Sequence, residues 1–211
     1  MLKKNDIITT EIIDYSSDGN GVAKYDNMVI FVPFTAVGDV CEIKITKVLS
    51  AYSFGRCEKV ITPSADRVAP ACPISRQCGG CDFQHISYEA EKQAKHNFVK
   101  SAFERIAKLD CEVRPTMSCD EHTRYRNKAQ FPVSVDENGK AITGFYAARS
   151  HRVIPCEDCL LQPIELNEIA QHTVKLLNRL KIKGYNEENP DDYLPVVESM
   201  LTVVRSIVIN G

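Results

Sequence analysis

The chain has 211 residues, of which 44% are hydrophobic and 26% charged, and its formal net charge is −2 at pH 7. This composition is typical of a globular protein and excludes collagen, coiled coil and wholesale disorder. The net charge excludes a global basic field, so any contact with nucleic acid must come from a local patch. No apolar run reaches the roughly 18–20 residues of a membrane span, and the start lacks the apolar segment of a signal peptide. We therefore expect a cytoplasmic monomer with no membrane partner.

The first 62 residues predict short strands and no helix. Strands are expected over residues 7–13, 21–25, 28–32, 40–48 and 53–61. A two-residue hairpin turn is expected at Asp26-Asn27. On the 40–48 strand, Cys41, Ile43 and Ile45 alternate with polar residues and form an apolar face. Five short strands at regular spacing predict a small closed β-barrel of the OB type over residues 1–62.

A linker at residues 62–67 separates this barrel from a second domain over residues 63–211. Helices are expected over residues 87–109, where Ser87 can cap the first turn, and over residues 163–180. Extended segments are expected over residues 125–135, 141–147, 151–154 and 201–209. The whole chain is therefore predicted to be α+β, with an antiparallel sheet and two main helices in the second domain.

Nine cysteines are unusual for a chain with no sign of export. Their odd number and the reducing setting argue against a disulfide framework. The spacing C-x5-C-x2-C brings three of them within ten residues: Cys72, Cys78 and Cys81. Gly79 and Gly80 let the backbone fold tightly between the last two. These three thiols predict a metal or cluster site that needs a fourth ligand.

The fourth ligand is Cys156 or Cys159, and the spacing leaves two kinds of site open. One is a 4Fe-4S cluster held by the three clustered thiols and one distant cysteine, which leaves Cys156 unexplained. The other is a zinc site built from two C-x2-C pairs, at residues 78–81 and 156–159, which leaves Cys72 unexplained. The remaining cysteines have no ligand-like spacing and are expected in the core: Cys41, Cys57, Cys111 and Cys119.

A local basic patch is predicted between residues 121 and 152, where six basic residues stand against three acidic ones. Arg124, Arg126 and Lys128 alternate, so on a strand they share one face and can follow a phosphate backbone, with Tyr125 on the other face. A solvated outer strand face is the alternative. The barrel offers further candidates, each of which alone is better explained as core or ordinary surface: Lys24, Tyr25, Phe31, Phe34 and Lys47. His85 is expected to stack on a base or cap the following helix, and lone histidines are more often structural.

Several motifs occur in the order found in one family. They are Cys72 to His85 with Cys78-Gly-Gly-Cys81, then Tyr125-Arg-Asn-Lys128, Gly144-Phe-Tyr146, Ser150-His151 and Cys159-Leu-Leu-Gln162. With them the chain resembles the iron–sulfur-containing uracil-5 RNA methyltransferases that modify 23S ribosomal RNA. The first sixty residues likewise resemble a TRAM domain, through Gly19-Asn-Gly21-Val22, Phe31-Val32-Pro33 and Gly38-Asp39.

The resemblance implies a set of functional residues. The 4Fe-4S ligands would be Cys72, Cys78, Cys81 and Cys159. The RNA-binding residues of the central domain would be Arg124, Tyr125, Arg126, Lys128, Arg149 and His151. The partner would be RNA, in particular 23S ribosomal RNA, and the methyl donor S-adenosylmethionine.

The chain also departs from the family pattern. In the family a methyltransferase domain follows, with the S-adenosylmethionine loop, the nucleophilic cysteine and the general base. This chain has no G-x-G-x-x-G after a strand and ends on an apolar stretch. We therefore expect the front part of a longer enzyme, with no catalytic or S-adenosylmethionine-binding residue of its own, inactive alone, whose helix over residues 87–109 packs on the absent domain. The alternative is a stand-alone RNA-binding module with a structural zinc site held by four cysteines and no catalysis.

Overall fold

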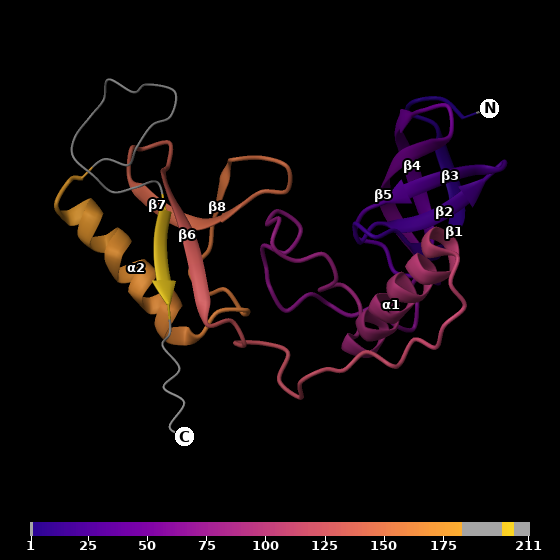
Figure 1. Cartoon of the computed structure of the whole chain (residues 1–211). Helices are drawn as coiled ribbons and strands as arrows, with labels where there is room; N and C mark the ends of the chain where they lie inside the picture. Colours follow the sequence, from indigo (N-terminus) through magenta and orange to yellow (C-terminus); the bar gives the residue numbers. More distant parts are fainter. Residues whose placement is uncertain (1, 183–199, 205–211) are drawn as a thin grey trace. The chain divides into compact units, whose positions relative to one another are not determined.

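The computed structural model describes residues 2–182 and 200–204, and the chain forms two compact units (Figure 1). The first unit consists of Met1–Ala71 and Cys81–Ser118, and the second of Cys72–Gly80 and Cys119–Gly211. None of the described helices has the length and apolar character needed to cross a membrane.

The first unit contains the predicted barrel. Its strands are β1 (Ile7–Tyr15), β2 (Gly21–Tyr25), β3 (Met28–Val32), β4 (Val40–Val48) and β5 (Tyr52–Thr62). They close in the order β1-β2-β3-β5-β4, and all neighbours are antiparallel except β3 and β5. Asp26 and Asn27 have φ angles of 46° and 62°, as a tight two-residue hairpin turn requires. The prediction of an OB-type barrel is confirmed.

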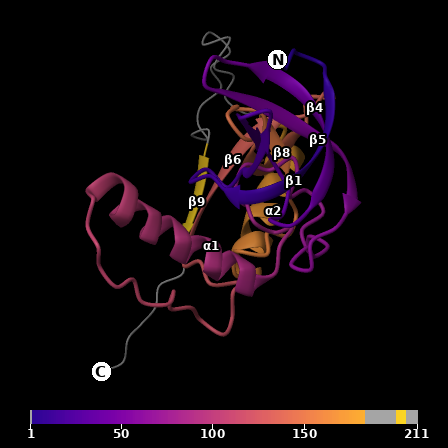
Figure 2. The same cartoon turned by 90° about the vertical axis from the view of Figure 1, so that its right-hand side faces the viewer.

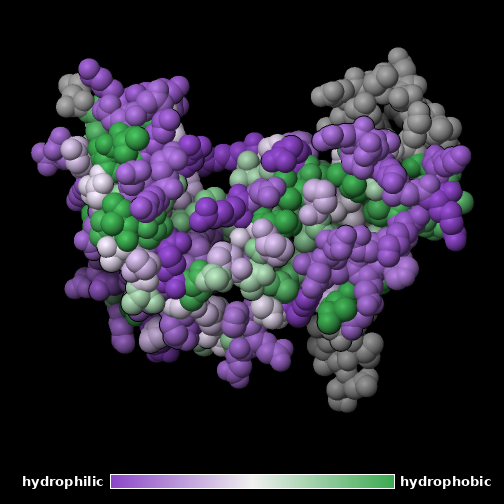
Figure 3. Space-filling model, turned by 180° about the vertical axis from the view of Figure 1, so that it is seen from behind, coloured by the Kyte–Doolittle hydropathy of each residue, from purple (hydrophilic) through white to green (hydrophobic). Residues whose placement is uncertain are grey.

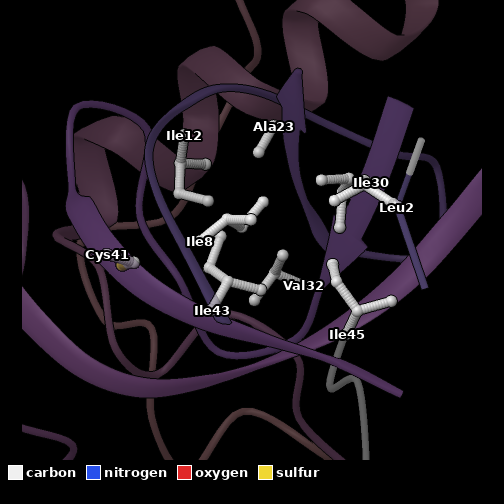
Figure 4. Close-up of a cluster of buried hydrophobic side chains, with 9 residues drawn as sticks. All are labelled: Leu2, Ile8, Ile12, Ala23, Ile30, Val32, Cys41, Ile43 and Ile45. Carbon is white, nitrogen blue, oxygen red and sulfur yellow. The ribbon is translucent and has the colours of Figure 1, made fainter. Parts of the chain in front are cut away.

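The barrel interior is filled by aliphatic side chains that alternate with outward-facing residues. Ile43, Ile45 and Cys41 are fully buried on β4, as predicted, and Ile12 and Ile30 face them from β1 and β3 (Figure 4). Burying each such isoleucine contributes roughly 1.5–3 kcal/mol relative to leaving it exposed. These side chains fix the register of the strands, because a slip by one residue would turn the whole set outward.

The expected linker at residues 62–67 is fixed to the barrel by a buried ion pair. The Asp39 carboxylate is fully buried and accepts a hydrogen bond from the backbone N–H of Ser64 at 2.9 Å and from Nε of Arg67 at 3.0 Å. It also accepts the backbone N–H of Ala36. Arg67 donates further to the carbonyl oxygen of Phe34. The segment that leaves the barrel is therefore part of the folded unit.

Helix α1 (Tyr88–Ser101) begins as predicted, because the Ser87 hydroxyl accepts the backbone N–H three residues on, at 3.2 Å. Its last turns form a π-helix, η1 (Ala102–Ala107), which ends at Lys108 in the left-handed conformation. The apolar side chains near this end remain exposed, and Ile106 is 82% accessible.

Residues 108–127 contain no helix or strand (Figure 2). Cys111 and Cys119 lie in this segment and are exposed, so the expectation that they belong to a core is wrong. A segment with no regular structure and few apolar residues forms no apolar surface against which these two cysteine side chains could be buried. Cys57 on β5 is partly buried against the barrel core, as expected.

The second unit is an antiparallel sheet with one helix against it. Its strands are β6 (Lys128–Val135), β7 (Ala141–Tyr146), β8 (Val153–Pro155) and β9 (Met200–Val204), in the order β8-β7-β6-β9. Helix α2 (Ile164–Arg179) begins after Pro163 and lies beside the sheet (Figure 1). Its Leu166 and Ala170 pack on the fully buried Phe131 of β6. The α+β prediction is confirmed. Of the strand expected over residues 201–209, residues 205–209 lie outside the described part.

Candidate metal centre and RNA-binding residues

The cysteine loop is attached to the end of strand β7 within the second unit. The backbone N–H of Gly79 donates to the carbonyl oxygen of Tyr146 at 2.9 Å, and Cys78 pairs with Ala147 as an isolated β-bridge. A Cβ on Gly79 would lie 2.8 Å from the backbone nitrogen of Ala148. Only glycine therefore permits this approach, which explains the first of the two glycines between Cys78 and Cys81.

The turn that carries Cys159 is held by side chains from two other segments. The backbone N–H of Cys159 donates to Oδ1 of Asn167 on α2 at 3.2 Å, and the Asn167 amide donates to Asp158 at 2.9 Å. Arg124 binds both carboxylate oxygens of Asp158, at 2.6 and 2.7 Å, and donates to the carbonyl oxygens of Cys159 and Gln162. Hydrogen bonds from both segments therefore converge on residues 158–162 and fix the Cys159 backbone.

Four thiols of the second unit interact with one another. The Cys156 thiol donates a hydrogen bond to Cys159, which lowers the pKa of Cys159 to about 6. The backbone groups of Leu161 and Gln162 act in the same direction. The hydrogen bond to Cys159 and burial raise the pKa of Cys156. Cys72 and Cys78 are close enough to contribute electrostatically to the same group, and burial raises the pKa of Cys78.

Cys81 belongs to the first unit and follows Cys78 by three residues. Its sulfur accepts a hydrogen bond from the Gln84 amide at 3.4 Å, and the Cys78 sulfur accepts one from the backbone N–H of Gly80 at 3.4 Å. Among the described residues, no three Cys, His, Asp or Glu side chains are gathered closely enough to hold one metal ion as they stand. The donor chemistry nevertheless fits thiolate ligands, because N–H groups directed at sulfur stabilise the deprotonated form that a metal binds.

The expected strand at residue 125 begins only at Lys128, so the prediction that three cations share one strand face is wrong. Arg124 has a φ angle of 57°, outside the range of a strand, and its side chain is paired with Asp158. The pairing with Asp158 raises the pKa of Arg124, so the guanidinium stays charged and the Asp158 carboxylate balances that charge. The pattern misled because alternating polar residues do not themselves distinguish a strand from a loop that is fixed by tertiary hydrogen bonds.

The other predicted RNA-binding residues of the central domain lie at the surface. Tyr125 is 59% accessible, and Arg126, Lys128 and Arg149 are also exposed. The exposed His151 ring lies 5.6 Å from the Tyr146 ring. Their contact with RNA stays a prediction.

The barrel candidates divide into two groups. Phe34 contacts the His85 ring at 6.2 Å, and His85 is buried with Nε2 3.1 Å from the carbonyl oxygen of Thr35. His85 therefore has a structural position and does not face solvent as a base-stacking residue would. Lys24, Phe31 and Lys47 lie on the outer face of the barrel, and Tyr25 lies beside the hairpin turn, 37% accessible.

Sequence reasoning missed the residues that position Cys159. Asn167 and Asp158 have no motif spacing with the cysteines, and both act through hydrogen bonds that only the folded turn creates. The one available signal is that Pro163 starts α2 four residues after Cys159, which brings the first turn of a helix close to the ligand turn.

A family model described as TRAM domain matches residues 3–57, the region of the barrel. The chain is 43% identical over 188 residues to an uncharacterized RNA methyltransferase of Halalkalibacterium halodurans, and 40% identical over 188 residues to one of Listeria monocytogenes. These matches cover 89% of this chain, which spans 41% of the length of each relative.

The fold is also similar to that of Pyrococcus abyssi tRNA (uracil-54, C5)-methyltransferase, whose crystal structure is a complex with S-adenosyl-L-homocysteine. The TM-score is 0.52 at 22% identity, over 82% of this chain and 37% of that one. At this identity the likeness concerns the fold. The chain therefore matches a TRAM domain over the barrel and is similar, over most of its own length, to part of proteins named RNA methyltransferase.

Proposed function

We propose that the chain is the RNA-recognition and cluster-bearing part of an S-adenosylmethionine-dependent RNA uracil-5-methyltransferase. The observation that carries this proposal is the meeting of the cysteine loop with the Cys159 turn in the second unit. Cys72 and Cys78 come from one side of it, and Cys156 and Cys159 from the other. These segments are about eighty residues apart in the sequence, and their thiols have no other evident reason to meet.

Cys72, Cys78, Cys81 and Cys159 are the ligands we assign to a 4Fe-4S cluster. Cys159 is preferred over Cys156 because its side chain is only partly buried and its sulfur receives hydrogen bonds from the backbone of Leu161 and Gln162, whereas Cys156 is buried. Cys156 then supports the ligand from a buried position, as residues around metal sites commonly do. No electron acceptor motif surrounds the loop, so the cluster would serve to hold it on the hairpin that ends near residue 159.

In the complete enzyme, the remaining part would supply the S-adenosylmethionine site, the nucleophilic cysteine and the base that removes the C5 proton of uracil. The present chain would bind and orient the RNA. We assign this role to the barrel, to the half-buried Arg124, and to the exposed residues of the central domain: Tyr125, Arg126, Lys128, Arg149 and His151. We propose 23S ribosomal RNA as the substrate.

Metal analysis of the chain purified without oxygen tests the ligand assignment. We expect about four irons and four sulfides per chain with a broad visible absorption band. The variant Cys159→Ser should lose most of the iron, whereas the matched Cys156→Ser should retain it and bind it more weakly. Equal iron content in Cys159→Ser and wild type would refute the assignment. The activity is tested separately, by 5-methyluridine formation with the full-length enzyme and ribosomal RNA.

A second candidate is a structural zinc site in a stand-alone RNA-binding module, which the direct contact between Cys156 and Cys159 favours. Two thiols of one C-x2-C pair are common ligands of a single zinc ion. One zinc per chain with no sulfide, lost equally in Cys156→Ser and Cys159→Ser, would support this candidate over the cluster.

A further inference from the structure

Three aromatic side chains lie together on the outside of the barrel. The ring centroid of Phe31 lies 5.5 Å from that of Tyr52 and 5.8 Å from that of Phe54, and Tyr52 and Phe54 are 5.6 Å apart. Each ring therefore contacts the other two. We call these residues the aromatic triad.

The strand pairing places the triad on one solvent-facing surface. Strands β3 and β5 are parallel, with Phe31 opposite Phe54, and residues opposite each other share a face. The intervening Ile30 and Ser53 are buried inside, so the triad must point outward. No member belongs to the buried core cluster, and Tyr52 is 37% accessible. Figure 3 shows apolar side chains gathered over the barrel among hydrophilic ones.

Lysines flank the triad on both neighbouring strands. Lys24 on β2 is opposite Val29 of β3, and Lys47 on β4 is opposite Phe54. Both lysines are exposed, and within the described residues neither forms an ion pair. Arg56 also lies on this face, but Glu58 neutralises it at 2.7 Å. Two uncompensated cations therefore border an aromatic surface.

Apart from Glu58, which is paired with Arg56, two acidic residues lie at the margins of this face. Glu42 is farther along β4, opposite Lys59, and Asp14 on β1 is opposite Val22. Neither is paired with a strand position of the triad. The centre of the face is therefore apolar and aromatic, and the charge next to it is positive.

The aromatic rings and the adjacent positive charge together favour single-stranded RNA over a protein or a duplex. Lysine is depleted at protein interfaces, whereas a strand with alternating bases and phosphates needs aromatic surfaces and cations side by side. A duplex hides the faces of its bases, so it offers the rings nothing to stack on. The three rings together leave a partly exposed aromatic surface, with Tyr52 exposed and Phe31 and Phe54 half-buried, and an occupant that stacks on the rings would cover it.

We propose that this face is a stacking surface for unpaired bases of RNA. Phe31, Tyr52 and Phe54 contact the bases, and Lys24 and Lys47 contact the phosphates on either side. The proposal rests on the RNA-binding function given above and specifies which surface of the barrel carries it.

Fluorescence anisotropy of the 211-residue chain with a labelled oligouridylate of about 12 nucleotides tests the proposal. We expect Tyr52→Leu and Phe54→Leu each to weaken binding roughly tenfold or more, because base–aromatic stacking contributes about that factor per ring. Phe103→Leu is the matched control, since Phe103 lies in the same unit and is 38% accessible. It should bind as the wild type does.

Two further measurements do not depend on the stability of the leucine variants. The chain contains no tryptophan, so Tyr52→Trp introduces a single reporter whose fluorescence should be quenched saturably by the oligouridylate. Lys24→Gln and Lys47→Gln should each lower the slope of log affinity against log salt by about 0.7.

The outcomes separate this proposal from the function on which it rests. Weakening in the triad variants, with quenching of the tryptophan, supports the stacking surface. Unchanged binding by both triad variants overturns it and leaves RNA binding to another surface of the chain. Equal affinity for a duplex of the same length also overturns it. Failure of the wild type to bind any RNA overturns the RNA-binding function together with this proposal.

Discussion

The buried pair of Asp39 and Arg67 fixes the segment after the barrel, and Asp39→Asn tests its contribution to stability. Asparagine keeps the shape of the side chain but removes the charge, so the Arg67 guanidinium loses its counter-charge. It also replaces one of the two acceptor oxygens by an NH2 donor, which would face the N–H group of either Ala36 or Ser64. Breaking a buried pair from one side costs about 3–5 kcal/mol.

Thermal unfolding followed by far-ultraviolet circular dichroism measures this loss at pH 7. For a chain of this length, each kcal/mol shifts Tm by roughly 2–4 °C, so we expect a decrease of about 6–20 °C. The control is Glu58→Gln in the surface pair with Arg56, whose side chains are 32% and 68% accessible. An exposed pair contributes about 1 kcal/mol or less.

The same pair predicts a pH dependence. Burial alone raises the pKa of Asp39, but the Arg67 guanidinium and the backbone N–H groups of Ser64 and Ala36 outweigh it and lower the pKa below its ordinary value of 3.8. The unfolded chain has the ordinary pKa, so the stabilisation is fully present above pH 3.8 and is lost as the pH falls through the folded pKa. The difference in Tm between wild type and Asp39→Asn should shrink over this range. A difference near zero at pH 7, or one that does not change in acid, would refute the reasoning.

Three other substitutions test the second unit. A Cβ at Gly144 would lie 1.9 Å from the carbonyl oxygen of Ile154, so Gly144→Ala must separate β7 from β8. We expect the free energy of unfolding, measured by urea titration, to fall by at least about 1–3 kcal/mol. An unchanged midpoint of the titration would contradict this expectation. Gly79→Ala should displace the cysteine loop from Ala148 and lower the iron content of the anaerobically purified chain, and wild-type iron would count against a loop held there. Asn167→Ala leaves the Cys159 turn without its partner on α2 and should cost about 1–3 kcal/mol, which the same titration measures.

The barrel was predictable because its signals are local. Alternation along residues 40–48 needs only the period of a strand, and Asp26-Asn27 provides the positive φ angles that a short hairpin requires. The start of α1 was likewise visible, since a serine before a helix accepts a nearby N–H group. The change to a π-helix at Ala102 has no local signal that we recognise in the sequence.

The surroundings of Cys159 were not predictable, because they depend on contacts between distant residues. Arg124 has the sequence neighbours of a strand residue, yet its backbone N–H donates to the carbonyl oxygen of Leu160 and its side chain binds Asp158. These bonds join positions more than thirty residues apart, and they place Arg124 in a conformation that strand residues avoid. A basic residue close to a predicted ligand therefore has two possible roles, RNA contact or support of the ligand turn. Only the folded turn distinguishes them.

The choice between Cys156 and Cys159 follows from the same reasoning. Both belong to one C-x2-C pair, so spacing alone does not distinguish which of them is the fourth ligand. The fold makes them unequal, because Cys156 is buried, whereas Cys159 is only partly buried and its sulfur receives hydrogen bonds from the backbone of Leu161 and Gln162. A ligand must bind as the thiolate, so the thiol that its neighbours help to ionise is the better donor to iron. In the cluster that we propose, the buried Cys156 would stabilise the ligand without binding metal, which would account for a fifth cysteine beside the four assigned ligands.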